Sequence, residues 1–143
     1  MKTPMIHAYL NFGGRCEEAL DFYKAALGGK VATLLRFNES PEPPPPGRIP
    51  PGFENKVMHA ELHIGEAMLM ASDGCSEGAN FQGFSLSLSF PTTDEVDRAF
   101  AALSKGGEVR MPLGKTFFSP RFGMVVDRFG VSWILIQPGE TPK

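Results

Sequence analysis

Three polar side chains capable of metal binding or acid–base chemistry alternate along one segment of the chain. His59, Glu61 and His63 occupy every second position. The positions around and between them are apolar: Met58, Ala60, Leu62 and Ile64. Alternate residues of a strand share a face and lie roughly 6.5–7 Å apart, so an imidazole and a carboxylate can converge on one ion. If His7 faces the same way, then His7, His59 and Glu61 form a candidate divalent-metal site. The competing interpretation is a polar strand face whose histidines bond to neighbouring groups or water.

A second set of side chains is suited to binding a small molecule. Hydroxyl and amide groups alternate with apolar residues in two predicted strands, at Tyr9 and Asn11 in one and at Ser87 and Ser89 in the other. Arg121 offers a planar guanidinium for an anionic ligand, or else a surface salt bridge. Aromatic and methionine residues form either an apolar pocket wall or ordinary core and dimer interface. The predicted ligand-binding residues are Tyr9, Asn11, Ser87, Phe118, Arg121 and Trp133.

Two cysteines complete the reactive groups. Cys16 falls in the first turn of a predicted helix, where the helix dipole lowers a thiol pKa; the alternative is a small reduced residue without a role. Cys75 lies in a turn-rich segment. The spacing of the pair matches neither a CxxC motif nor a disulfide framework.

The elements that position these residues are duplicated. Matching residues recur at a constant offset of 78: Phe12 and Phe90, Glu17 and Glu95, Phe22 and Phe100, Gly28 and Gly106, Gly29 and Gly107, Val31 and Val109. Each copy has a strand, a helix with an apolar stripe, a Gly-Gly stop and further strands. A unit that cannot bury its apolar face alone packs on its twin.

The expected elements of the first copy are strands at 5–12, 31–37, 57–64 and 67–72, with a helix at 15–27. In the second copy, Thr92 and Glu95 form a capping-box signature before the helix. Strands are expected there at 84–90, 109–111, 124–126 and 131–137. The pattern predicts an α+β fold of two tandem βαβββ modules, with a curved, cup-shaped mixed sheet and helices outside. One domain spans 1–143, with module one at 1–75 and module two at 82–140.

A proline-rich stretch at 38–56 interrupts the first copy. Proline lacks a backbone donor, so this stretch does not join a sheet centre. It is either a linker that tolerated insertion or a flap over a pocket, since long loops within compact domains are often functional.

Composition narrows the range of partners. The net charge is −2 over 143 residues, and no basic run indicates nucleic acid. No apolar stretch is long enough to span a bilayer, and the N-terminus carries no signal-peptide pattern. We therefore expect a cytoplasmic protein with no nucleic-acid or membrane partner.

The chain resembles the vicinal oxygen chelate superfamily, which includes glyoxalase I, bleomycin-resistance proteins and extradiol dioxygenases, and within it the PhnB-like group. The segments that carry the resemblance span nearly the whole chain: Ala8–Gly14, Cys16–Lys24, Val57–Gly65, Leu69–Asp73, Met111–Leu113, Arg121–Asp127 and Phe129–Trp133. The resemblance implies a glyoxalase-like cup and a homodimer. Proteins of this group often carry a demethylubiquinone methyltransferase label. No glycine-rich loop opens a doubly wound fold here, so no nucleotide cofactor is expected.

The resemblance also implies one divalent metal, held by His or Glu from the first and last strand of each module. Those positions fall on His7, Met70, Ser85 and Ile134. Thioether, hydroxyl and alkyl groups are poor ligands for such an ion. This count favours a metal-free protein that sequesters a small metabolite or drug. The alternative is a metal-dependent lyase, isomerase or transferase acting on a small polar metabolite.

Overall fold

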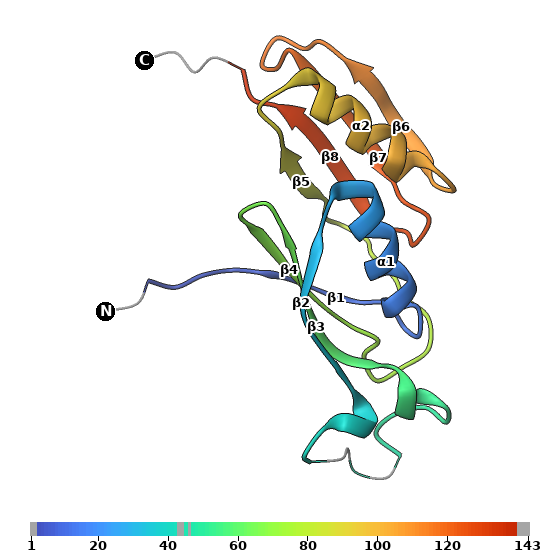
Figure 1. Cartoon of the computed structure of the whole chain (residues 1–143). Helices are drawn as coiled ribbons and strands as arrows, with labels where there is room; N and C mark the ends of the chain where they lie inside the picture. The colour runs from blue at the N-terminus through green and yellow to red at the C-terminus, as the bar shows by residue number, and fades with distance from the viewer. Residues whose placement is uncertain (1–2, 43–44, 46, 140–143) are drawn as a thin grey trace. The chain divides into compact units, whose positions relative to one another are not determined.

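The chain divides into two compact units, one up to Ala79 and one from Asn80 onward. A computed structural model describes residues 3–42, 45 and 47–139. Figure 1 labels the helices and strands of both units. Each unit is one βαβββ module, as the repeat predicts. The fold is α+β, with one four-stranded mixed sheet and one α-helix in each unit.

Unit one carries the first copy of the repeat. Its elements are β1 (Ala8–Asn11), α1 (Cys16–Leu27), β2 (Lys30–Arg36), the 3₁₀ turns η1 (Phe37–Glu39) and η2 (Phe53–Asn55), β3 (Val57–Ile64) and β4 (Ala67–Ser72). The strand order is β1-β4-β3-β2. β1 runs parallel to β4, and the other neighbours are antiparallel. The predicted hairpin around residues 65–66 is present as the β3–β4 connection.

Unit two repeats this arrangement. Its elements are β5 (Leu86–Ser89), α2 (Thr93–Ser104), β6 (Glu108–Gly114), β7 (Arg121–Val126) and β8 (Ser132–Gln137). The order β5-β8-β7-β6 has the same pattern of one parallel and two antiparallel pairs. β5 and β6 begin 78 residues after their counterparts β1 and β2. The offset found in the sequence therefore also relates equivalent strands of the structure.

The two copies lose register at one connection. Between β2 and β3 the chain runs 20 residues, from 37 to 56, whereas β6 and β7 are joined by six, from 115 to 120. The difference of 14 residues is the proline-rich insertion. Within the described part, it contains a 3₁₀ turn at each end, and residues 43, 44 and 46 lie outside the description.

Each helix buries an apolar stripe. In α1 the buried side chains are Cys16, Ala19, Leu20 and Tyr23, and in α2 they are Val96, Ala99 and Leu103. α1 contacts β2 and β3, and α2 contacts β6, β7 and β8. α1 ends as predicted, with Gly28 as its C-cap at a φ of 68°. α2 ends at Ser104 with Lys105 as an extended C-cap, just before Gly106, whose φ is 75°. No helix among the described residues is long and apolar enough to cross a membrane.

The first strand of each unit is shorter than predicted. The pairing of β1 begins at Ala8, opposite Leu69, and Ile6 before it is 99% exposed. Alternation alone extended that strand to residue 5, because a period-2 pattern does not reveal where the neighbouring strand ends. In unit two, β6 and β7 are longer than predicted, since their outer residues alternate poorly.

Candidate functional site

The sheet of unit one presents two chemically different faces. In β3, Ala60, Leu62 and Ile64 are buried, whereas His59, Glu61 and His63 are only partly covered. Leu62 lies against Gly29 at the end of α1, so the buried set faces the helix. The opposite face, called here the open face, carries the polar residues, as the alternation predicts.

Three side chains of the open face form a continuous polar chain. The Tyr9 hydroxyl lies 3.2 Å from His59 Nδ1, and the two rings have centroids 5.7 Å apart. His59 Nε2 lies 3.5 Å from Glu61 Oε2. Tyr9 belongs to β1 and His59 to β3, so the phenol reaches across β4. We call Tyr9, His59 and Glu61 the open-face triad.

Burial controls the protonation of the phenol in the triad. Burial raises the pKa of Tyr9 above its ordinary value, with a smaller opposing effect from a hydrogen bond with Ser72. The phenol therefore keeps its proton at neutral pH, and it shares a hydrogen bond with His59 Nδ1. The other ring nitrogen of His59, Nε2, faces the Glu61 carboxylate. The triad can thus orient a ligand through one phenol, one imidazole and one carboxylate.

The donor set of the described residues does not fit the metal that the resemblance implies. No three His, Cys, Asp or Glu side chains in residues 3–42, 45 and 47–139 are grouped so as to hold a metal ion. The structure pairs two of the three predicted metal residues, His59 and Glu61. His7 precedes β1 and completes no such group.

The resemblance implies that His7 and Ser85 lie level with Met70 and Ile134, but the strand register places other residues there, two positions further along the chain. Tyr9 is level with Met70, and Ser87 is level with Ile134. His7 and Ser85 precede these positions and lie outside β1 and β5. The Ser85 hydroxyl is bound to the Ser132 hydroxyl at 2.7 Å.

The remaining predicted ligand residue of unit one is Asn11. It is exposed in β1, two residues beyond Tyr9 and on the same face. Gly74 packs against its side chain: a Cβ atom there would lie 3.3 Å from Asn11 Oδ1. Asn11 thus extends the polar row of the open face toward the end of β4.

The predicted ligand residues of unit two differ from one another in exposure and bonding. Ser87 and Phe118 are exposed. The Arg121 Nε donates to Asp97 at 2.8 Å, so its guanidinium makes the salt bridge that was the alternative interpretation. Trp133 is 2% exposed, and its indole N–H donates to Asp127 at 2.8 Å. The indole therefore belongs to the core of this unit rather than to a surface open to a ligand.

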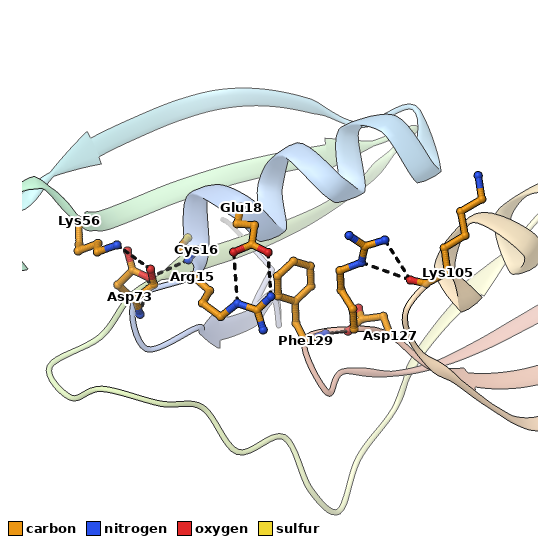
Figure 2. A network of polar contacts seen from close by, with 10 residues as sticks. Arg15, Cys16, Glu18, Lys56, Asp73, Lys105, Asp127 and Phe129 are labelled. Carbon is orange, nitrogen blue, oxygen red and sulfur yellow. Dashed lines mark hydrogen bonds and ion pairs between the residues drawn. The ribbon is translucent and has the colours of Figure 1, made fainter.

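Sequence reasoning missed Asp73, which organises the start of α1. Asp73 is 1% exposed, and Oδ1 accepts from the backbone N–H of Gly14 at 2.8 Å and of Cys16 at 2.7 Å. Oδ2 accepts from Val57 N–H at 2.8 Å, which joins the start of β3 to the same carboxylate. Figure 2 shows Asp73 beneath the first turn of α1. The sequence signal was weak, since the residue stands in a turn-rich stretch.

Asp73 also settles the chemistry of Cys16. The thiol is buried, and burial first and the Asp73 charge second raise its pKa far above the ordinary value. A helix N-terminus lowers a thiol pKa and burial raises it, and at Cys16 burial has the larger effect. Cys16 is therefore an unreactive core residue, and Cys75 is the exposed thiol of the described chain.

Comparisons with known proteins agree with this fold. Residues 6–135 match the family described as the Glyoxalase/Bleomycin resistance protein/Dioxygenase superfamily. Protein YjdN of Escherichia coli K12 is 32% identical over 140 residues, covering 94% of this chain and 95% of YjdN.

Two solved structures are similar over nearly the full chain. Protein PA1353 of Pseudomonas aeruginosa is 40% identical, with a TM-score of 0.82, and the match covers 96% of this chain and 100% of that one. The PhnB protein of Bacillus cereus is 30% identical, with a TM-score of 0.76, and the match covers 94% and 99% respectively. Its PhnB name agrees with the group that the sequence resembles.

Proposed function

Because the chain belongs to the glyoxalase/bleomycin resistance protein/dioxygenase superfamily, we propose that it is a metal-free binding protein for a small polar metabolite or drug. The observation that carries the proposal is the open-face triad. Its imidazole is engaged on both sides, by Tyr9 and by Glu61. Both ring nitrogens thus face neighbouring side chains, and the triad as a whole can exchange hydrogen bonds with a ligand.

The ligand class follows from the groups on the open face. A phenol, an imidazole and a carboxylate offer both donors and acceptors, and Asn11 adds an amide. Met68 and Met70 lie in the intervening strand β4, where flexible thioether side chains adapt to an apolar ligand surface. We propose Tyr9, Asn11, His59 and Glu61 as ligand contacts in unit one. Ser87 and Phe118 stay predictions for unit two.

The test combines metal analysis with ligand screening. Elemental analysis after dialysis against zinc, nickel and manganese is expected to give far less than one ion per chain. A thermal-shift screen of polar metabolites is expected to yield compounds that raise the melting temperature, since binding to the native state stabilises it. Stoichiometric metal that is lost in His59→Asn would overturn the proposal and favour the metal-dependent enzyme.

A matched pair of variants locates the ligand. His59→Asn and Tyr9→Phe are expected to abolish the thermal shift. His63→Asn is the control, because His63 lies on the same strand and face but outside the triad. A ligand whose binding is unaffected by both triad variants contradicts the location on the open face. The homodimer implied by the resemblance and the cytoplasmic location expected from the sequence are also part of the proposal, and light scattering of the purified protein tests the first.

A further inference from the structure

The proline-rich insertion of unit one borders a hollow of about 860 Å³. Its described lining comes from three segments: the end of the β2 region, the insertion, and the stretch after β4. The lining includes Phe37, Ile49, Pro50, Glu54, Cys75 and Glu77. None of them belongs to the open-face triad. The hollow has the volume of a small-molecule site, which typically measures about 300–1,000 Å³.

The wall of this hollow is largely apolar and partly rigid. Phe37 is 7% exposed and is held by a backbone bond from its N–H to Lys56 at 3.1 Å. Ile49 and Pro50 are half-buried in the insertion. Phe53 N–H donates to the Pro50 carbonyl at 3.2 Å, which fixes this part of the insertion against η2. A preformed apolar wall lowers the entropy cost of binding.

Charge gives the hollow its selectivity. Two carboxylates, Glu54 and Glu77, line it, and no lysine or arginine is among its described lining residues. Neither carboxylate makes an ion pair within the described part of the chain. An organic cation with an apolar body matches this combination, since its charge faces the carboxylates and its body covers Phe37 and the prolines.

We propose that this hollow is a binding site for a small organic ammonium compound, separate from the open face. Unit two has only six residues at the equivalent connection. The site is thus a feature that the 14-residue insertion adds to one copy of the repeat. This assigns the described lining residues of the insertion, such as Ile49 and Pro50, the role of a pocket wall.

Cys75 provides a built-in reporter of occupancy. It lines the hollow and is exposed, whereas Cys16 is buried. A neutral reagent such as iodoacetamide is therefore expected to alkylate Cys75 alone in the native protein. Cys75→Ser removes that signal and confirms the assignment.

The experiment measures how added compounds slow the alkylation of Cys75 at neutral pH. Benzyltrimethylammonium, benzyl alcohol and phenylacetate give a series with one ring and positive, zero and negative charge. We expect saturable protection by the cation, weaker protection by the alcohol and none by the anion. Equal protection by all three, or no saturable protection by the cation, would overturn the proposal.

Charge variants sharpen the result. Glu54→Gln and Glu77→Gln are each expected to raise the half-protecting concentration of the cation by about 1.4- to fivefold, the range for exposed ion pairs. Glu66→Gln, in the exposed β3–β4 turn, changes the same charge elsewhere and is expected to have no effect. Tyr9→Phe is likewise expected to leave protection unchanged. An unchanged half-protecting concentration in both Glu54→Gln and Glu77→Gln contradicts the role of charge.

Discussion

Each unit buries one aspartate that accepts three N–H groups, but the two aspartates bind at very different sequence distances. Asp73 in unit one accepts from groups 59, 57 and 16 residues away. Asp127 in unit two accepts from Phe129 and Val131 N–H and from the Trp133 indole, only 2, 4 and 6 residues away. Figure 2 shows both carboxylates.

The difference separates a local turn from a long-range tie. Asp127 shapes the connection between β7 and β8, whose residues Arg128 and Gly130 are exposed. Asp73 joins the start of α1, the start of β3 and the end of β4. Long-range contacts require much of the unit to be ordered first, because loop closure costs entropy. Unit one, which carries the open face, is therefore more dependent on its aspartate.

The largest expected effect is that of Asp73→Ala. It leaves three backbone donors without an acceptor, and two of them, at Cys16 and Val57, belong to buried residues. We expect the free energy of unfolding of unit one to fall by about 3–5 kcal/mol. Urea unfolding by far-UV circular dichroism measures the change. Trp133, the only tryptophan of the chain, reports unit two by fluorescence. A decrease of less than about 1 kcal/mol in the free energy of unfolding would contradict the role of Asp73 in connecting these segments.

A smaller effect is expected from Asp127→Ala, about 2–3 kcal/mol. Water can reach the exposed turn and replace part of the lost bonding, while the buried indole N–H loses its acceptor. Trp133 fluorescence is expected to change, and amide exchange to rise over residues 127–133. A destabilisation larger than that of Asp73→Ala would reverse the comparison between the two carboxylates.

The helix N-termini give the next contrast. The Thr92 hydroxyl accepts from Glu95 N–H at 3.2 Å, whereas Arg15 at the start of α1 makes no side-chain capping bond. We expect Thr92→Ala to cost about 1 kcal/mol. Arg15→Ala is the matched change and is expected to cost less, because Asp73 performs the capping in unit one. Urea midpoints of both variants test this, and equal losses would contradict it.

The smallest effect concerns an ion pair found in one copy only. Arg36 donates to the Glu17 carboxylate from its two terminal nitrogens, Nη1 at 3.0 Å and Nη2 at 2.8 Å. This bonding lowers the pKa of Glu17. A lowered folded-state pKa gives stability that is present above the ordinary carboxyl range and lost as pH falls through the folded value. Glu17→Gln is expected to flatten the acid dependence of the urea midpoint, by less than the Thr92→Ala shift because the pair is exposed.

The control for this pair is its counterpart in unit two. At the offset of 78, Glu17 corresponds to Glu95 and Arg36 to Gly114, so no guanidinium stands opposite. Glu95→Gln is therefore the control variant, because it removes a carboxylate from the matching helix position without breaking a bond to a guanidinium. A flattening as large as that of Glu17→Gln would mean that the Arg36 pair is not its cause.

Local patterns predicted most of the scaffold. β3 and β4 occupy the predicted ranges, α1 ends directly before its Gly-Gly stop, and α2 ends two residues before its own. Strand alternation also placed His59 and Glu61 on one face. These features depend on residues within a few positions of one another, so they can be predicted from the sequence alone. The predicted ends of the first strand of each unit were wrong, because strand pairing depends on a partner strand elsewhere in the chain.

The candidate site depended on contacts that no local pattern contains. Tyr9 meets His59 only because β4 lies between their strands and the register aligns Tyr9 with Met70. Trp133 was expected at a ligand surface, yet its indole is taken by Asp127. The spacing of a few aromatic residues does not distinguish a pocket wall from a core.

By itself the sequence determined the duplicated βαβββ scaffold, the two faces of β3 and the position of the insertion, because each is written in periodicity or in the offset of 78. Tertiary structure decided which polar groups meet. In the folded chain, Tyr9, His59 and Glu61 come into contact, and Asp73 accepts hydrogen bonds from three distant donors. A hollow also forms beside the insertion. These outcomes depend on strand order, register and side-chain reach, which arise only when distant segments pack together.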